Sequence, residues 1–298
     1  MAQLEVGQFE KVASGIYLEG LAVDTKRNIV WYSDVIAGGV HGLMPDGSVR
    51  SFNEKRMWTG GIMLNEDGAV LSSGPGGILW NHPETGKSGW LIDTIDGKPV
   101  NGINEMMPDG DGGLLFGTSD IEMVERGQPT RPTAIYRLTV DRKLIRLADG
   151  IHFTNGIMLS ADRRRFYCND TFVCTHVFDV QPDLTLTNQR RFLDKTDADG
   201  MALDAEGNLW VTGFRSSHIE RIRPDGSRLQ PVRTPGGAVT QIRFGGPDMR
   251  DYYINTVPAD GGDSLKDGVP LTERKSVMYR GRSDIPGMPI PPTRFKLS

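Results

Sequence analysis

Short runs of alternating apolar and polar residues recur along the chain as one repeated unit. The unit consists of a glycine, a brief apolar stretch, a polar turn and a second apolar stretch, as in GLAVDTKRNIVWYSD and GMALDAEGNLWVTG, and the sixth copy lacks the leading glycine. The six copies begin at Gly20, Gly61, Gly102, Gly156, Gly200 and Gln241, and successive starts are 41 to 54 residues apart. A repeat of about 40–45 residues is typical of a four-stranded propeller blade. The pattern therefore predicts an all-β, six-bladed β-propeller that forms a single domain over residues 1–298.

Turn residues between the apolar stretches favour strands over helices. Asp-Gly pairs begin at Asp46, Asp67, Asp109 and Asp225, and glycine supplies the positive φ that tight hairpin turns need. No long stretch has apolar residues at helical spacing. A β-sandwich or two small β domains would be the alternative, but the regular period and the lack of a Pro/Ser-rich linker argue against both. We expect the leading glycines to let the inner strands approach one another near the axis.

Two segments fall outside the repeat. An insertion around IEMVERGQPTRPT, residues 121–133, lengthens the third interval. The Pro-rich segment IPGMPIPPTRF, residues 285–295, follows the last repeat. We expect this second segment to cover or close the propeller.

The composition argues against several classes of partner. The 298-residue chain has a formal net charge of −4 and a sequence pI of about 5.8, which favours neither nucleic acid nor an anionic membrane. No apolar run approaches the ~18 residues of a membrane span, and MAQLEVGQFEKVASG lacks the features of a signal peptide. We expect Cys168 and Cys174 to be free thiols on neighbouring strands, in a reducing cytoplasm. A small-molecule substrate is the expected partner.

Four polar residues lie just before or inside the repeated glycine motif, where an inner strand starts near the axis. They are Glu19, Asn104, Asn155 and Asp199, whereas the remaining two repeats have Gly60 and Thr240 there. Converging oxygen ligands that include two carboxylates need a partner, because unpaired buried charge is costly. One divalent cation would satisfy them, with Ca²⁺, Mg²⁺ or Mn²⁺ favoured by the oxygen donors and Zn²⁺ also possible. The alternative is that each residue caps a turn or bonds its own backbone.

These positions resemble the senescence marker protein/gluconolactonase/luciferin-regenerating enzyme family over nearly the whole chain. The resemblance is carried by Glu19-Gly20, Asn104, Thr154-Asn155-Gly156, Asp199-Gly200-Met201, FGGPD from Phe244 and RGRSDIPGMP near the C-terminus. It implies a six-bladed propeller in which Glu19, Asn155 and Asp199 bind the metal. It also implies that Asn104 contacts water or substrate beside the metal and that Asp199 is the general base. Lactone hydrolysis with Ca²⁺, Zn²⁺, Mn²⁺ or Mg²⁺ is typical of the family.

One departure from the sugar-lactone members of that family concerns the substrate. Where those members often carry Arg-Phe-Asn-Asp, with the Arg on sugar hydroxyls, this chain has Gly102, Ile103, Asn104 and Glu105. We therefore expect a hydrophobic or aromatic lactone in place of a sugar lactone. The candidate substrate-binding residues are Asn104, Glu122, Trp58, His152, Phe153 and Phe172, with Met57 and Met106 as further candidates for the cavity. The alternatives are an exposed loop carboxylate for Glu122 and core packing for the apolar side chains.

The leading hypothesis is thus a metal-dependent hydrolase that opens a lactone ring, with Asp199 and Asn104 as catalytic residues. Two other functions remain open at this point. One is a different metal-assisted reaction at the same site, such as isomerisation, hydration or lyase chemistry, because a fold does not fix its chemistry. The other is a non-catalytic binding propeller whose metal is structural.

Overall fold

Four of the repeats form separate four-stranded antiparallel sheets. The computed structural model describes residues 4–297. Residues 1–3 and residue 298 lie outside the described residues. The segment expected to lack signal-peptide features therefore begins outside them. The sheets are β2 (Leu18–Asp24), β3 (Ile29–Asp34), β4 (Val40–Leu43) and β5 (Val49–Phe52); β6 (Ile62–Leu64), β7 (Val70–Ser72), β8 (Ile78–Asn81) and β9 (Ser88–Ile92); β12 (Ile103–Pro108), β13 (Leu114–Thr118), β14 (Thr133–Leu138) and β15 (Leu144–Ile151); and β16 (Thr154–Leu159), β17 (Arg165–Asp170), β18 (Cys174–Val180) and β19 (Leu186–Leu193).

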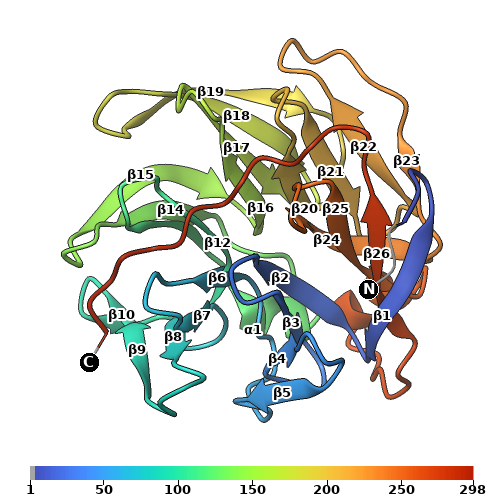
Figure 1. The fold of residues 1–298 in the computed structure, drawn as a ribbon. Coiled ribbons are helices and arrows are strands. Elements are labelled where there is room, and N and C mark those ends of the chain that lie inside the picture. The colour runs from blue at the N-terminus through green and yellow to red at the C-terminus, as the bar shows by residue number, and fades with distance from the viewer. Residues whose placement is uncertain (1–3, 298) are drawn as a thin grey trace.

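The other two repeats join into one eight-stranded sheet. Its strands are β20 (Ala198–Leu203), β21 (Leu209–Gly213), β22 (His218–Ile222) and β23 (Val232–Arg233), followed by β24 (Ala238–Gly245), β25 (Asp251–Val257), β26 (Ser276–Arg282) and β1 (Phe9–Gly15). The pair Gly213–Val239 links β21 to β24. Because β1 pairs with β26, strands from near both ends of the chain meet in this sheet (Figure 1).

The innermost strands contact one another in a closed ring. The order is β2, β6, β12, β16, β20, β24 and back to β2, and the sheets radiate from this ring in Figure 1. The smaller elements are α1 (Ile121–Glu125), α2 (Gly261–Lys266) and the hairpin β10 (Thr94–Ile95) with β11 (Lys98–Pro99). The predicted all-β propeller fold is confirmed, and α1 lies in the predicted insertion. Within residues 4–297, no helix has the length and apolar character needed to cross a membrane.

The ring is tight because glycine backbones meet at the axis. A Cβ on Gly20 would lie 2.0 Å from the carbonyl oxygen of Gly60, and a Cβ on Gly60 would lie 2.3 Å from that of Asn104. A larger residue at either position would push two sheets apart. The expected close approach of the inner strands is therefore confirmed.

Apolar side chains fill the space between neighbouring sheets. Trp31, Trp210 and Tyr167 are among the largest fully buried side chains. The two cysteines lie on neighbouring strands of one sheet, as expected, with Cys168 on β17 and Cys174 on β18. Both are buried and carry free thiols.

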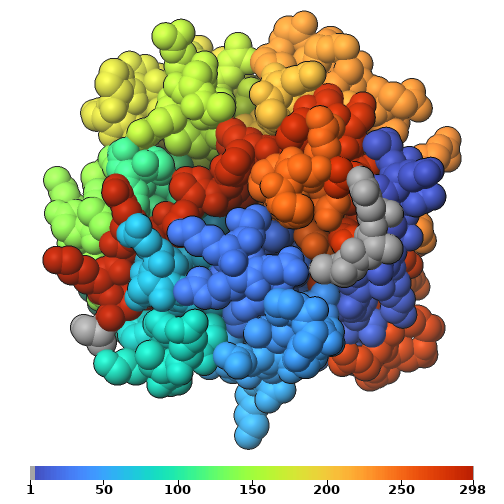
Figure 2. Space-filling view, viewed as in Figure 1, coloured from blue at the N-terminus to red at the C-terminus, as the bar shows by residue number. Residues whose placement is uncertain are grey.

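The Pro-rich C-terminal segment crosses one face of the propeller. Met288 donates its backbone N–H to the carbonyl of Leu203 at 2.8 Å, and Thr293 donates to that of Leu64 at 2.9 Å. The segment therefore spans from the β20 sheet to the β6 sheet, and Figure 2 shows it in red across this face. The expectation that it covers the propeller is confirmed.

Candidate active site

Each of the four predicted axial residues lies in a β-bulge of an inner strand. The pairing register shifts between Leu18 and Leu21, around Glu19, and between Ile103 and Glu105, around Asn104. Equivalent shifts surround Asn155 on β16 and Asp199 on β20. A bulge bends a strand and redirects a side chain. All four side chains consequently line one cavity of about 60 Å³ at the same end of the inner strands.

Side chains from the second strand of each sheet hold these bulges in place. Ser73 on the β7 side donates its hydroxyl to the carbonyl of Asn104 at 2.8 Å. Thr171, just after β17, donates to the carbonyl of Ala198 at 2.7 Å. Both bonds cross from one sheet to the next. The backbone beside the axial side chains is thereby fixed by contacts that span the ring.

The two carboxyl groups of the site are buried, and neither forms an ion pair with a described residue. Glu19 Oε2 and Asp199 Oδ1 have no hydrogen-bond partner, and the buried Arg243 lies 3.3 Å from Glu105 instead. Burial, followed by the negative charge of Glu105, raises the pKa of Glu19 to about 8. Burial, followed by the charge of Glu19, raises the pKa of Asp199 well above its ordinary value. The cavity therefore disfavours two ionised carboxylates unless a positive charge joins them.

The oxygen atoms of this cavity fit a divalent cation. Within residues 4–297, no group of three or more His, Cys, Asp or Glu side chains is arranged to hold a metal ion, so amide oxygens would have to complete the set. Asn155 is oriented for this, because its Nδ2 donates to Thr171 Oγ1 at 3.1 Å. Asn155 Oδ1 accepts a 3.0 Å bond from Asn104 Nδ2. Two carboxylates with unpaired oxygens and an oriented amide are suitable ligands for a hard cation.

Asn104 keeps one polar atom free for a ligand. Its Nδ2 donates both to Asn155 Oδ1 and to the carbonyl of Thr154, at 3.0 and 3.1 Å. With both N–H groups used, the available atom is its Oδ1, an acceptor. The sequence resemblance implied that Asn104 contacts either water or substrate. A free acceptor favours the water, because a substrate oxyanion would need a hydrogen-bond donor.

Aromatic residues form the walls above these polar groups. Trp58, Phe153 and Phe172 line the cavity, as the sequence predicted. Phe172 also packs edge-on against Phe214, with ring centroids 5.8 Å apart. Trp58 and Phe172 have left-handed backbones, with φ of +56° and +76°, which bulky residues adopt only when the surroundings enforce it. The walls are therefore held in place by the backbone as well as by packing.

The structure places the other candidates outside the cavity. Glu122 is exposed on α1 and forms an ion pair with Arg126. His152 is half-exposed, with Nδ1 3.3 Å from Asp170 Oδ2. Neither is among the lining residues, so we no longer expect either to contact a ligand there. Met57 is exposed and Met106 packs in the core.

Tyr17 is a site residue that sequence reasoning missed. It lies two positions before Glu19 and lines the same cavity; the alternation of a strand was a signal that could have found it. Burial, then the charges of Asp199 and Glu19, raise the pKa of its phenol well above the ordinary value. Tyr17 is therefore a neutral hydrogen-bond donor beside the carboxyl groups.

Lys266 is the second site residue that sequence reasoning missed. Among the described residues that line the cavity, it is the one with a cationic side chain. It ends α2, and its Nζ lies 5.7 Å from the centre of the Phe172 ring. No repeat signal marks this segment, because α2 lies in the connection between β25 and β26. A positive charge thus stands at an otherwise apolar wall.

Gly102, where the sugar-lactone members often carry an arginine, packs closely against Ile121. A Cβ on Gly102 would lie 2.5 Å from Ile121 Cδ1. Ile121 begins α1, in the insertion that lengthens the third repeat. The insertion therefore places an apolar side chain against Gly102, and Val124 of the same helix lines the cavity.

The fold and this cavity define a class: an all-β propeller with two buried carboxyl groups and two amides at one end of its axis. The family model for the SMP-30/gluconolactonase/LRE-like region matches residues 18–258. The chain belongs to this family, as the sequence resemblance indicated.

Individual relatives agree with this assignment. Regucalcin from Danio rerio is 32% identical over 169 residues, covering 54% of this chain and 56% of that protein, so the match spans little more than half of its length. The pentonolactonase XacC from Haloferax volcanii is 24% identical over 82% of each chain. A crystal structure of a calcium-binding protein, regucalcin from Agrobacterium tumefaciens, superposes with a TM-score of 0.77 at 19% identity, covering 96% of this chain and 95% of that one. At that identity the superposition concerns the fold alone.

Proposed function

We propose that this protein is a metal-dependent hydrolase that opens a lactone ring. The observation that carries the proposal is the pair of unpaired, buried carboxyl oxygens, Glu19 Oε2 and Asp199 Oδ1, at the base of an apolar cavity. Membership of the gluconolactonase-like family and similarity to a pentonolactonase support the lactone as the substrate class.

Glu19, Asn155 and Asp199 would hold one divalent cation in this proposal. Ca²⁺ is the first candidate, supported by the oxygen donors; Zn²⁺, Mn²⁺ and Mg²⁺ are the others. When bound, such an ion polarises a carbonyl oxygen and lowers the pKa of water. Its charge would also relieve the repulsion between the two carboxylates.

The protein side chains would divide the remaining work. Asp199 would accept the proton of the attacking water as general base. Asn104 would orient that water through its free Oδ1. Tyr17, a neutral donor, would offer its O–H to the lactone carbonyl oxygen, on which negative charge develops in the transition state. Asp199 is both a ligand and the base, and both roles belong to the proposal.

The cavity walls favour an apolar lactone. Trp58, Phe153 and Phe172 offer burial but few hydrogen bonds, and a sugar lactone would leave hydroxyl groups desolvated and unpaired. Ile121 packs against Gly102, the position that lacks the arginine of the sugar-lactone members. Lys266 at the wall further favours a lactone that bears an anionic substituent away from its reacting carbonyl.

The proposal includes the architecture as well. The closed ring of six inner strands supports six blades in one domain, with the eight-stranded sheet counted as two blades joined at Gly213–Val239. The free thiols of Cys168 and Cys174 support a cytoplasmic location.

A lactone screen with and without chelator tests the function. We expect hydrolysis of at least one aromatic lactone, loss of activity with chelator and its return with added Ca²⁺, Zn²⁺, Mn²⁺ or Mg²⁺. Hydrolysis that survives complete metal removal would contradict the metal-dependent step. Tight metal binding without turnover of any lactone would favour a structural metal in a binding propeller.

A further inference from the structure

Two buried aspartates occupy equivalent places beside the candidate active site. Asp34 ends β3 and is paired with the residue before Glu19, and Asp170 ends β17 and is paired with the residue before Asn155. Their exposed fractions are 2% and 1%. A buried carboxylate is costly unless hydrogen bonds or a cation compensate its charge, so each of these side chains must be held by its surroundings.

Asp34 joins its own turn to the segment that carries Tyr17. Its Oδ2 accepts a 2.7 Å bond from the backbone N–H of Ile16, and its Oδ1 accepts one of 3.1 Å from that of Tyr17. Oδ1 also accepts the N–H groups of Ile36 and Ala37 in the turn after β3, at 3.1 and 2.9 Å. Bonds to a charged acceptor are roughly twice as strong as those between neutral groups. The backbone of Tyr17, which lines the cavity, is therefore fixed to the end of β3 by a carboxylate.

Asp170 makes the equivalent connection to Phe153, with a different set of partners. The backbone N–H groups of His152 and Phe153 both donate to its Oδ1, at 2.9 and 3.0 Å. Its Oδ2 faces two imidazoles, with His152 Nδ1 at 3.3 Å and His176 Nε2 at 3.5 Å. Like Tyr17, Phe153 lines the cavity. Each aspartate thus holds one aromatic residue of the candidate active site.

A carboxylate stands in this place in two of the four repeats with a polar axial residue, and both of these repeats have an aromatic residue two positions before the axial one. In the other two repeats, within the described residues, these two places hold Thr118 and Gly102, and Gly213 and Asp197. The two carboxylates therefore accompany the aromatic residues, which a purely architectural role in the repeat would not require.

We propose that Asp34 is a positioning residue for Tyr17 and that Asp170 has the same role for Phe153. Asp34 keeps the phenol of Tyr17 where it can donate to the lactone carbonyl oxygen. Asp170 keeps the ring of Phe153 where it packs against the body of the lactone. Misplacement of a group at a reacting centre by about 1 Å can cost about 10²-fold in rate, so a residue that touches no substrate can still control turnover. Both roles rest on the proposed lactone hydrolysis.

Replacement by asparagine distinguishes the two aspartates. In Asp34→Asn one oxygen becomes an amino group, so the N–H of either Ile16 or Tyr17 faces another donor and the segment must move. In Asp170→Asn one oxygen can keep both backbone bonds, and the amino group can face imidazole nitrogens that accept in their neutral tautomers. We expect Asp34→Asn to lower kcat about tenfold with little change in KM, and Asp170→Asn to keep wild-type kinetics. Asp170→Ala, which loses both bonds, should raise the KM for dihydrocoumarin about tenfold.

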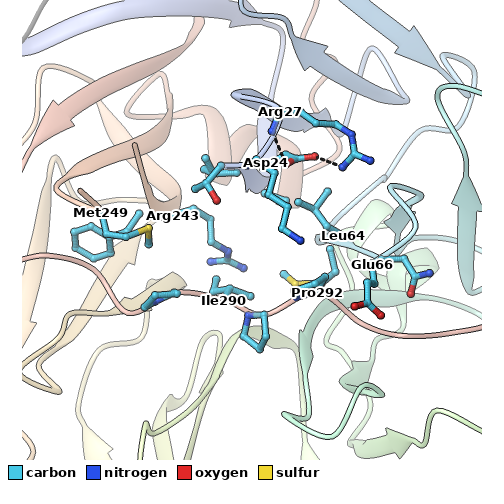
Figure 3. Close-up of a pocket in the computed structure, with 17 residues that line it drawn as sticks. Asp24, Arg27, Leu64, Glu66, Arg243, Met249, Ile290 and Pro292 are labelled. Atoms are coloured by element: carbon cyan, nitrogen blue, oxygen red, sulfur yellow. Dashed lines mark hydrogen bonds and ion pairs between the residues drawn. The ribbon is translucent and has the colours of Figure 1, made fainter. Parts of the chain in front are cut away.

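Asp24 provides a matched control at the far end of β2. It is also buried, and its Oδ1 accepts the N–H groups of Lys26 and Arg27 in its own turn, at 3.1 and 3.0 Å. Figure 3 shows its ion pair with Arg27 at the cavity beneath the C-terminal segment, where Ile290 lies. Because these partners lie outside the active-site cavity, Asp24→Asn should leave kcat and KM unchanged.

A double-mutant cycle locates the effect of Asp34. In the Tyr17→Phe background, where the hydroxyl is already absent, Asp34→Asn should lower kcat by less than about twofold. An equal tenfold loss with and without the hydroxyl would assign Asp34 to general stability and overturn the proposal. Loss of bound metal from Asp34→Asn would overturn it as well, because the variant would then act through Glu19.

Two further measurements make the test independent of folding and of turnover. If Asp34→Asn does not fold, Gly15→Ala replaces it in the cycle, because an added Cβ would lie 2.5 Å from Asp34 Oδ2 and displace the carboxylate without removing it. In crystal structures, Tyr17 should move by about 1 Å or more in Asp34→Asn, and Phe153 should stay in place in Asp170→Asn. An unmoved Tyr17 would overturn the proposal even in a protein that hydrolyses a lactone. A displaced Tyr17 in a protein that hydrolyses none would overturn the proposed function and leave the link between Asp34 and Tyr17 standing.

Discussion

Asn169 donates a 2.6 Å hydrogen bond from Nδ2 to the backbone carbonyl oxygen of Asp199, across the junction between two sheets. Asn255 forms the equivalent 2.6 Å bond to the carbonyl of Glu19. Thr175 in turn donates to Asn169 Oδ1 at 2.7 Å, which fixes the amide. The bulges that carry the two carboxyl groups are therefore held through their backbone. Glu19 Oε2 and Asp199 Oδ1 meanwhile keep no hydrogen-bond partner.

Replacement of Asp199 by alanine should weaken metal binding at least tenfold, because it removes one of the two carboxylates of the site. The measurement is the metal content after dialysis, with the affinity determined by calorimetry. Asp194→Ala is a matched control, since Asp194 is exposed and pairs only with Arg191 among the described ion pairs. An Asp199→Ala protein with unchanged metal content would remove Asp199 from the ligand set.

Asn104→Ala should keep the fold and most of the metal but lower kcat by about 10²–10³, as removal of one positioned polar group in a reaction site commonly does. Asn101→Ala, at an exposed position three residues earlier, should turn over normally. Circular dichroism and metal analysis check that the variant is intact. A metal-replete Asn104→Ala protein with near-normal kcat would contradict the role of Oδ1 in orienting water.

Tyr17→Phe tests the neutral phenol with the smallest possible change. The hydroxyl alone is lost, so we expect kcat to fall by about tenfold or more with little change in KM or metal affinity. Tyr136→Phe, a buried tyrosine stacked on Phe116, is the control. A loss that appears only in KM would assign Tyr17 to substrate binding in place of transition-state stabilisation.

The metal-free protein should become less stable as the pH rises from about 4.5 to about 8. Burial raises the pKa of Glu19 from 4.5 to about 8, so between these values the folded state binds more protons than the unfolded state. Stability therefore falls with rising pH in this window, by an amount on the order of a few kcal/mol. Thermal unfolding of chelated protein at several pH values measures the effect.

Added metal should reverse this trend, because a cation favours the ionised carboxylates. The increase in Tm on adding Ca²⁺ should be larger at pH 8 than at pH 5. If the Tm of the chelated protein rose steadily from pH 5 to pH 8, the raised pKa values assigned to Glu19 and Asp199 in the metal-free protein would be contradicted.

Lys266 should determine a preference for anionic lactones. Lys266→Met should lower kcat/KM for a carboxylate-bearing aromatic lactone about tenfold and leave neutral dihydrocoumarin unaffected, since only the first loses an ion pair. Lys98→Met, in an exposed hairpin, is the control.

The carboxylate-bearing aromatic lactone and dihydrocoumarin should both have a higher kcat/KM than gluconolactone when all three are assayed with the same metal ion. A clear preference for the sugar would show that other groups replace the absent arginine. Hydrolysis of both aromatic lactones with no effect of Lys266→Met would overturn the role of Lys266 while leaving the lactonase proposal standing.

The sequence alone determined the features that repeat. The strand pattern, the Asp-Gly turns and the leading glycines are local properties that return in several copies, so they predicted an all-β propeller. Because equivalent positions in a propeller converge on its axis, the repeat by itself also predicted that Glu19, Asn104, Asn155 and Asp199 lie together. Gly226 of the Asp225-Gly226 turn, for example, has a φ of +89°, which is the positive φ that the sequence predicted for such turns.

Only the tertiary structure decided what lies between the repeats. The bulge at Asp199 depends on Asn169 from another sheet, and no local pattern encodes that contact. The apolar wall depends on Ile121 packing against Gly102 and on the position of α2 with Lys266, both in connections of irregular length. Met288 meets Leu203 because the C-terminal segment crosses the finished propeller. These contacts join residues far apart in the chain, so they exist only once the ring of sheets has closed.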